Sequence, residues 1–173
     1  MIANQNVLDT EIVFDKDTCE GEGGTDRIDF CALRKGSPDN LEIVCYEAKH
    51  ILNQELKGKV LSQLERYRGH LRNSERVEEI LKSYKSVCEN IVEVCNGSDI
   101  TIPFLEFAKK VVESPQKLTV DPNPRLIVFG YDSVQRKGIL PKIKETLREG
   151  KLCEEHTLWC GNPGALRKGI KFE

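Results

Sequence analysis

The order of hydrophobic and polar residues predicts strands first and helices later. The first fifty residues alternate with the two-residue period of β-strands, which predicts strands over residues 6–15, 27–34 and 41–50. The links between them are turn-rich: residues 16–24 contain several glycines and acids, and residues 35–40 contain a Ser-Pro-Asp sequence. Links this short predict that the three strands form an antiparallel meander.

After His50 the period changes to that of helices. Apolar residues recur at helical spacing over roughly residues 55 to 95, with a break near Asn73-Ser74, so two amphipathic helices or one kinked helix are predicted there. Residues 125–131 are nearly all apolar, which is typical of a strand covered on both faces. The remaining predictions are a short helix over 103–113, a proline-rich connection over 114–124, a helix over 138–150 ended by Gly150, and a last strand over 156–160.

This order of elements predicts an α/β domain with a mixed central sheet and helices on both faces, which is a three-layer α/β/α architecture. Residues 1–173 are expected to form one domain, since a chain of this length builds a single core. No segment approaches the ~20 consecutive apolar residues of a membrane span, and the first residues lack the features of a signal peptide. We therefore expect a cytoplasmic protein with no membrane partner.

The cysteines fit the same compartment. There are seven of them, an odd number with no CxxC pair, so we expect reduced thiols rather than a disulfide framework or a zinc site. Cys31 and Cys45 lie inside apolar runs and are expected to be small buried residues. With 26 Lys plus Arg against 28 Asp plus Glu, the formal charge of -2 gives no broad basic field for nucleic acid, although a local patch stays compatible with that average.

Charged residues interrupt two of the predicted strands. Glu47 and Lys49 are two residues apart, so they project to the same face of one strand, and Asp29 interrupts an apolar run on the neighbouring strand. Two converging carboxylates repel each other, and Mg²⁺ relieves this by binding one or two carboxylates together with waters and substrate phosphates. A neighbouring lysine would orient or help to deprotonate the attacking water and stabilise charge on the phosphate. The pattern therefore indicates metal-assisted phosphodiester hydrolysis.

Three segments together carry a resemblance to a known family. TDRIDFCAL, LEIVCYEAKH and SQLERY resemble the PD-(D/E)XK nuclease superfamily, which has the restriction-endonuclease-like fold, in its branch with a RecB-type QxxxY motif. The resemblance implies that Asp29, Glu47 and the backbone carbonyl of Ala48 bind Mg²⁺ or Mn²⁺, with Lys49 as the catalytic lysine. It places Gln63 and Tyr67 near the active site and the DNA backbone. The implied function is a metal-dependent deoxyribonuclease, in a setting of restriction, repair or phage defence.

The resemblance departs from the family at the N-terminus. Members usually open with a helix that supplies another acidic group, whereas a strand-like segment precedes Asp29 here, either because this branch is short or because the chain was cut from a longer one. Glu11 is the best substitute for that acid, ahead of Glu20 and Glu22. Asp26 competes with Asp29, but it follows Gly-Gly-Thr and is expected in the loop.

Contacts with substrate are less sharply indicated. Arg66 lies beside Gln63 and Tyr67 on the same helix and is expected to contact nucleic acid, whereas Tyr67 fits core packing equally well. His50 is expected to face away from Lys49, and His70 and His156 have no identifiable partner. Basic residues form either a phosphate-binding surface or ordinary solvated faces: Lys57, Lys59, Arg66, Arg68, Arg72, Arg167, Lys168 and Lys171.

Two other interpretations stay open beside the nuclease. The first is a catalytically silent nuclease-like module that binds nucleic acid or a partner protein. The second is an α/β protein in which Glu47 and Lys49 form an ion pair with no other role. For the nuclease, the expected partners are a DNA substrate and either a second copy of the chain or a separate targeting subunit or domain. The sequence leaves open endonuclease or exonuclease action and DNA or RNA as the substrate.

Overall fold

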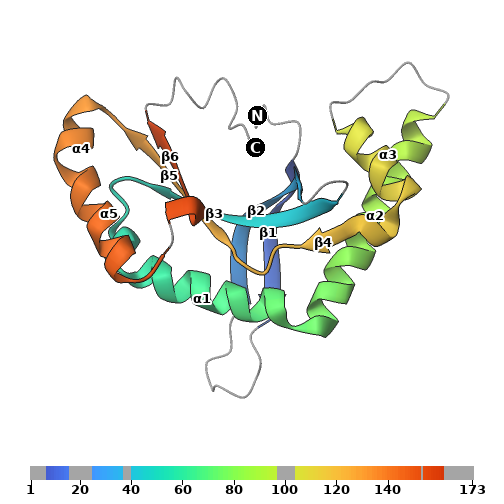
Figure 1. Cartoon of the computed structure of the whole chain (residues 1–173), viewed down its shortest axis with the longest axis horizontal. Helices are drawn as coiled ribbons and strands as arrows, with labels where there is room; N and C mark the ends of the chain where they lie inside the picture. Colours follow the sequence, from blue (N-terminus) through green and yellow to red (C-terminus); the bar gives the residue numbers. More distant parts are fainter. Residues whose placement is uncertain (1–6, 16–24, 37–39, 97–103, 153, 162–173) are drawn as a thin grey trace.

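The computed structural model describes residues 7–15, 25–36, 40–96, 104–152 and 154–161. Within them a six-stranded mixed sheet runs in the order β1-β2-β3-β5-β6, with β4 beside β3 (Figure 1). The α/β class and the mixed sheet are thus confirmed. The strands are β1 (Val7–Asp15), β2 (Thr25–Lys35), β3 (Leu41–His50), β4 (Leu118–Val120), β5 (Arg125–Tyr131) and β6 (Thr157–Gly161).

The predicted meander is confirmed, since β1, β2 and β3 pair antiparallel in chain order. The second half of the sheet is parallel: β4 and β5 both pair with β3, and β6 pairs with β5. Along β3, β4 pairs with the first residues and β5 with the last ones, from Tyr46 to His50. The end of β3 therefore pairs with β5, near the middle of the sheet.

The helices begin and end where the sequence provides caps. The predicted break near Asn73 is confirmed, because the Asn73 side chain accepts a hydrogen bond from the Arg76 backbone N–H and starts a new helix. Gly150 ends α5 as predicted, and it lies so close to Leu61 of α1 that a side chain would clash. The helices are α1 (Lys59–Arg72), α2 (Ser74–Cys95), α3 (Leu105–Glu113), α4 (Ser133–Lys137) and α5 (Ile139–Glu149), with short 3₁₀ turns η2 (Gln54–Lys57), η3 (Pro115–Lys117) and η4 (Glu154–His156).

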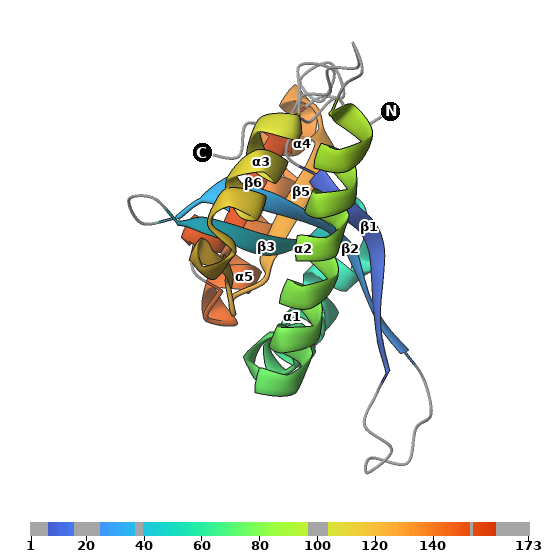
Figure 2. The ribbon, with the colours of Figure 1, turned by 90° about the vertical axis from the view of Figure 1, so that its right-hand side faces the viewer.

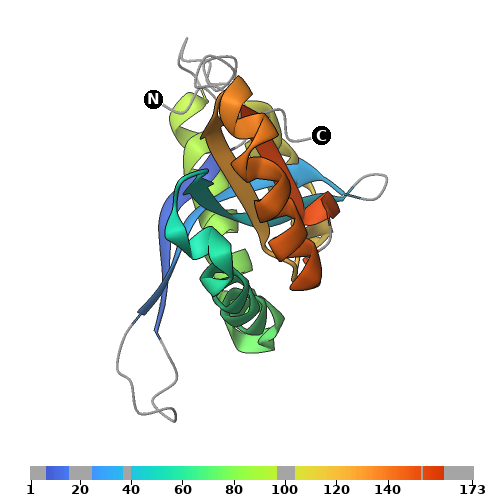
Figure 3. The ribbon, with the colours of Figure 1, turned by 90° about the vertical axis from the view of Figure 1, so that its left-hand side faces the viewer.

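The two faces of the sheet are covered differently. Helices α1, α2, α3 and α5 all bury side chains in the main core cluster, together with Ile43 and Cys45 of β3. The alternate residues Val44 and Tyr46 belong to a second cluster, to which only strands contribute among the described residues. In Figure 1 the helices line the left, lower and right sides of the sheet, with α2 and α3 together on one flank (Figure 2) and α5 near α1 on the other (Figure 3). The helices expected on the second face are not seen in the described part of the chain.

Two further sequence predictions need correction. Residues 114–124 are more than a connection, because they contain η3 and β4, and Leu118 of β4 is buried beside Leu41. A strand of three residues is too short to show a period. Cys31 and Cys45 are buried as predicted but form a disulfide, because the antiparallel register sets them directly opposite each other. No helix among the described residues is long and apolar enough to cross a membrane.

Candidate active site

The candidate site lies where β3 parts from β2. The antiparallel pairing of β2 with β3 runs from Lys35–Leu41 to Phe30–Tyr46. After Tyr46, the residues of β3 pair with β5. Glu47 is the first residue past this point and is only 1% exposed. A carboxylate at such depth is unfavourable unless other groups hydrogen-bond to it or neutralise it.

Three side chains supply those partners. The Lys49 ammonium lies 2.6 Å from Glu47 Oε1, and Gln63 Nε2 donates to the same oxygen at 2.9 Å. The Tyr67 hydroxyl lies 3.2 Å from Glu47 Oε2 and within hydrogen-bond distance of the backbone carbonyl of Arg27, so its single proton is shared between these two acceptors. Gln63 and Tyr67 are one turn apart on α1 and hydrogen-bond to each other at 2.6 Å. The spacing that suggested the QxxxY motif therefore sets both side chains against the carboxylate of Glu47.

The positive charge near Glu47 is too small to offset its burial and the negative charge of Asp29. Burial raises the pKa of Glu47 above its ordinary value, the hydrogen bond from Lys49 opposes this, and the negative charge of Asp29 adds to the rise. The net direction is upward, so Lys49 does not neutralise the site fully. The structure thus brings Asp29, Glu47 and Lys49 together, as the sequence predicted.

Asp29 faces the gap between the two strands. Its Oδ2 accepts a hydrogen bond from the backbone N–H of Ala48 at 2.7 Å. The hydrogen bond from Ile51 N–H to the Phe129 carbonyl shows that the odd-numbered residues here direct their backbone groups toward β5. Both backbone groups of a strand residue point to the same side, so the carbonyl of Ala48 also faces Asp29.

The strand regularity is disturbed at Asp29. Ile28 and Cys31 both lie in the main core although they are three residues apart, so the alternation of faces shifts by one between them. Glu11 of β1 lies opposite Asp29 and has a φ of 60°. The pairing of β1 with β2 includes the residues on either side of Glu11 and Asp29 but not these two residues themselves. A non-glycine residue in the left-handed region is uncommon and clusters at functional sites. At this irregularity the side chain of Asp29 turns toward β3, away from the face that strict alternation would give it.

Among the described residues Glu11 forms an ion pair with Arg27. Its carboxylate lies 3.6 Å from Arg27, and the side chain is 70% exposed. Glu20 and Glu22, the weaker candidates, lie outside the described residues. The additional acid of this site is instead Glu55 in η2, whose Oε2 lies 2.7 Å from the Lys49 ammonium. Sequence reasoning missed Glu55 because it lies in a single 3₁₀ turn with no periodicity; its only signal is its place between the Lys49 strand and the following helix.

Lys49 is therefore held by two carboxylates. Burial lowers the pKa of Lys49, but the hydrogen bonds to Glu47 and Glu55 outweigh this, and the pKa lies above its ordinary value. The same contact with Lys49 lowers the pKa of Glu55. Lys49 is consequently a cation at neutral pH.

The structure separates the two competing aspartates. Asp26 is 5% exposed and binds two residues of α1: its Oδ1 accepts from Arg66 Nε at 3.1 Å and its Oδ2 lies 3.0 Å from His70 Nε2. Phe14 stacks on the His70 ring, with centroids 4.9 Å apart. Asp26 thus lies in β2 and not in the loop where it was predicted, because β2 extends back to Thr25 and pairs Asp26 with Phe14. It ties β2 to α1 and gives His70 the partner that the sequence did not reveal, while Asp29 contacts the strand of Glu47.

The residues expected to contact nucleic acid differ in exposure. The Arg66 side chain is 48% exposed and Gln63 is partly exposed, so both reach the surface beside Glu47. Tyr67 is only 1% exposed, which suits a role in holding Glu47 rather than surface contact with DNA. His50 packs edge-on against Phe129 of the second cluster, which confirms that it faces away from Lys49. Arg167, Lys168 and Lys171 lie outside the described residues.

The donor set fits a hard divalent cation. The carboxylates of Asp29 and Glu47 are close enough to influence each other, and strand geometry directs the carbonyl of Ala48 to the side of Asp29, so the donors available are all oxygen. Oxygen donors suit Mg²⁺, which keeps several waters and needs only one or two carboxylates. The described residues contain no group of three or more His, Cys, Asp or Glu side chains arranged around a metal position. Comparisons with protein-family models, curated proteins and solved structures found no match for this chain.

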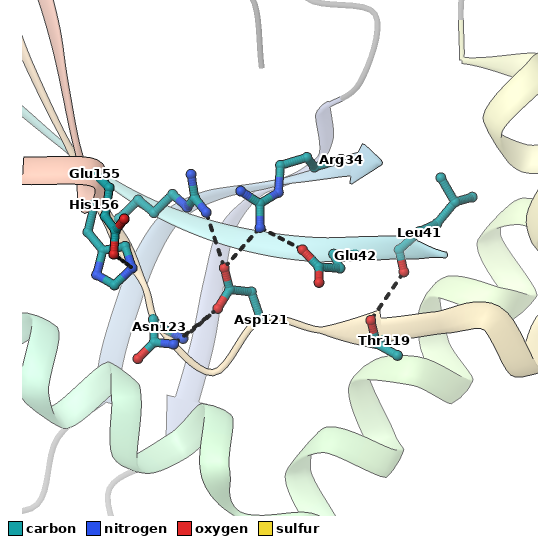
Figure 4. Close-up of polar contacts among 9 residues, drawn as sticks. Arg34, Leu41, Glu42, Thr119, Asp121, Asn123, Glu155 and His156 are labelled. Carbon is teal, nitrogen blue, oxygen red and sulfur yellow. Dashed lines mark hydrogen bonds and ion pairs between the residues drawn. The ribbon is translucent and has the colours of Figure 1, made fainter. Parts of the chain in front are cut away.

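A second polar cluster lies at the other end of β3, on the other face. Arg34 binds Glu42 at 2.6 Å and Asp121 at 3.4 Å, and Arg125 binds Asp121 at 3.4 Å (Figure 4). Asp121 also accepts the backbone N–H of Asn123 at 3.0 Å. The Nε atoms of Arg34 and Arg125 are buried without a hydrogen-bond partner among the described residues. We refer to Arg34, Glu42, Asp121 and Arg125 as the arginine cluster.

Proposed function

We propose that this chain is a metal-dependent deoxyribonuclease of the PD-(D/E)XK type, with a restriction-endonuclease-like core. The observation that carries the proposal is the buried Glu47 with a raised pKa, set between Asp29 and Lys49 at the point where β2 and β3 separate. A carboxylate kept in this state is destabilising for the fold and useful for binding a cation.

The topology supports the same assignment. An antiparallel meander is followed by α1 and α2, and the chain then returns as β5, parallel to β3 and adjacent to it. This arrangement puts the end of β3 in the centre of the sheet and α1 beside it.

Asp29, Glu47 and the Ala48 carbonyl would hold Mg²⁺ or Mn²⁺. The bound cation would polarise the scissile phosphate and lower the pKa of a water molecule. Gln63 and Tyr67 keep the carboxylate of Glu47 in place through hydrogen bonds from α1. Because two carboxylates hold Lys49 as a cation, its role is to stabilise negative charge on the phosphate rather than to accept a proton.

Binding of DNA would use the exposed edge of α1. Arg66 and Gln63 lie on that edge beside the site, with Lys59 one turn before Gln63 and 76% exposed. Their hydrogen-bond donors suit phosphate oxygens, so they would bind the DNA backbone without reading bases. With a formal charge of -2 for the whole chain, we expect modest and salt-sensitive affinity.

The test is cleavage of plasmid and linear DNA with Mg²⁺ or Mn²⁺. The native chain is compared with Lys49→Ala and Asp29→Ala, and Lys109→Ala serves as the control because Lys109 is a lysine of α3 whose ion-pair partner among the described residues is Glu106. We expect the native chain and the control to cleave DNA and both site variants to lose that activity. Equal activity in all four proteins would contradict the proposal.

Calorimetric titration with Mn²⁺ separates the nuclease from a silent nuclease-like module. A nuclease binds Mn²⁺ in a manner that depends on Asp29 and Glu47. A silent module binds DNA or a protein partner, and substitution of those two residues leaves its metal titration unchanged.

A further inference from the structure

We propose that Glu55 is a positioning residue that holds the Lys49 ammonium beside Glu47 without letting it occupy the place of the divalent cation. This inference rests on the proposed nuclease function and adds a residue to it. Its basis is a contact between two side chains on different elements: Lys49 at the end of β3, and Glu55 in the 3₁₀ turn before α1.

The ammonium of Lys49 is shared almost equally between two carboxylates. It lies 2.6 Å from Glu47 Oε1 and 2.7 Å from Glu55 Oε2, and its side chain is 12% exposed. An ammonium has three hydrogen-bond donors. Two of them serve the carboxylates, which leaves one donor for a substrate phosphate.

Glu47 alone would be a poor partner for Lys49 in a working site. A divalent cation and the lysine both carry positive charge, and both are attracted to the oxygens of Glu47. If Lys49 had no other partner, it would compete with the cation for Glu47. A second carboxylate on the far side of the ammonium weakens this competition, because it draws part of the interaction away from Glu47.

Glu55 is held in place by the turn that contains it. Its backbone N–H donates to Asn53 Oδ1 at 2.8 Å, and the next residue, Leu56, is fully buried. The second carboxylate oxygen of Glu55 lies 3.3 Å from the ammonium of Lys59 on α1. The backbone of Glu55 is therefore fixed by its turn, and its carboxylate has a partner on α1 besides Lys49.

The alternative is that Glu55 forms a salt bridge that only stabilises the turn. The two roles differ in what Glu55 does to metal binding. A positioning residue changes Mn²⁺ affinity through Lys49, so its effect disappears when Lys49 carries no charge. A stabilising salt bridge changes the free energy of unfolding and leaves Mn²⁺ affinity unchanged.

The experiment is a double-mutant cycle read by Mn²⁺ calorimetry in the absence of DNA. The proteins are the native chain, Glu55→Gln, Lys49→Gln and the double variant, with Glu65→Gln as the matched control. Glu65 is an exposed glutamate of α1 whose partner is Arg68. We expect Glu55→Gln to weaken Mn²⁺ binding by about tenfold in the native background and by less than about twofold in the Lys49→Gln background.

Cleavage kinetics give a second readout. We expect Glu55→Gln to lower kcat by about tenfold or more while the KM for DNA stays within about twofold, since Glu55 acts on the reacting centre and not on the DNA surface. Circular dichroism before each titration checks that every variant is folded.

The possible failures are distinguishable. If the native chain binds Mn²⁺ and cleaves DNA but Glu55→Gln behaves like Glu65→Gln, the positioning role is wrong and the nuclease stands. If Glu55→Gln weakens Mn²⁺ binding equally in both backgrounds, Glu55 acts on the cation directly and the positioning role is again wrong. If the native chain neither binds Mn²⁺ nor cleaves DNA, the nuclease proposal fails and this inference fails with it.

Discussion

Two polar clusters share strand β3 and differ in their balance of charge. In the arginine cluster, the carboxylates of Glu42 and Asp121 face the guanidinium groups of Arg34 and Arg125, so two negative charges meet two positive ones. At the candidate site, the carboxylates of Glu47 and Glu55 share the ammonium of Lys49, and Asp29 adds a further negative charge. The first cluster is neutral within itself, whereas the second has an excess of negative charge.

This difference is more informative than the number of ion pairs. In a neutral network of partly buried charges the protein itself balances the charge, although in the arginine cluster the Nε atoms of Arg34 and Arg125 still lack a hydrogen-bond partner among the described residues. An excess of buried negative charge raises the pKa of one of its carboxyl groups and weakens the fold, unless a cation from solution binds. We therefore expect Glu42 to be a structural glutamate and Glu47 to be a functional one under the proposed activity, although they belong to the same strand.

The largest expected effect comes from replacing Glu47 with glutamine, and the same replacement at Glu42 is the comparison. Glu47→Gln removes a carboxylate that would bind the metal, so we expect the rate of DNA cleavage to fall by roughly 10²- to 10³-fold. Glu42→Gln changes a contact of Arg34 on the other face of the sheet, so cleavage should stay within about twofold. Single-turnover cleavage with saturating Mg²⁺ measures both. Equal losses in the two variants would show that charge balance does not separate the clusters.

Loss of Asp121 should destabilise the fold more than loss of Asp29. Asp121 is the shared partner of Arg34 and Arg125, whose side chains are only 20% and 14% exposed. Asp121→Asn therefore leaves two largely buried guanidinium groups with reduced compensation, and we expect a loss of about 2–3 kcal/mol in the free energy of unfolding. Asp29→Asn removes one of several mutually repelling carboxylates and should lower stability by less. Urea unfolding of the two variants with a chelator present makes the comparison, and a greater loss for Asp29→Asn would contradict it.

Much of this arrangement was predictable because it depends on local pattern and short connections. The alternation in residues 41–50 defined β3 correctly, and the turn-rich links defined the meander that brings Asp29 to Glu47. The four-residue spacing of Gln63 and Tyr67 placed both on one face of α1. In each case the decisive contact follows from strand register or from helical periodicity, which the sequence shows directly.

The parts that were missed depend on contacts between distant segments. Glu55 reaches Lys49 through one 3₁₀ turn, and β4 is only a three-residue strand, so neither has a period to detect. The pairing of His70 with Asp26 joins residues 44 positions apart. The coverage of only one sheet face by the described helices is a property of tertiary packing, which alternation within a strand does not determine.

A smaller effect is expected on the stability of the metal-free protein. The pKa of Glu47 is raised in the folded state, so the folded protein holds this proton more tightly than the unfolded chain does. The stability associated with Glu47 is therefore fully present below its unfolded pKa and is lost as the pH rises through its folded pKa. Glu47→Gln resembles the protonated form, so we expect it to be more stable than the native chain by roughly 0.5–2 kcal/mol at neutral pH.

The same variant should lose this advantage in acid. Thermal unfolding of the native chain and Glu47→Gln across a pH series, with a chelator present, is the measurement. The difference between the two proteins should shrink as the pH falls through the range in which Glu47 becomes protonated. A difference that does not change with pH would mean that the packing of the amide, and not the charge of Glu47, determines stability.

The smallest expected effect concerns arginines on the two sides of the sheet. Arg66 is 48% exposed beside the site, whereas Arg34 is 20% exposed and binds both carboxylates of the arginine cluster. If Arg66 contacts a DNA phosphate, Arg66→Gln should reduce the slope of log K against log salt by about one, while Arg34→Gln leaves the slope unchanged. Fluorescence anisotropy of a labelled duplex over a salt series, in the Glu47→Gln background so that DNA stays intact, measures both slopes. A reduced slope for Arg34→Gln would place DNA on the second face of the sheet, and an unchanged slope for Arg66→Gln would remove Arg66 from the DNA surface.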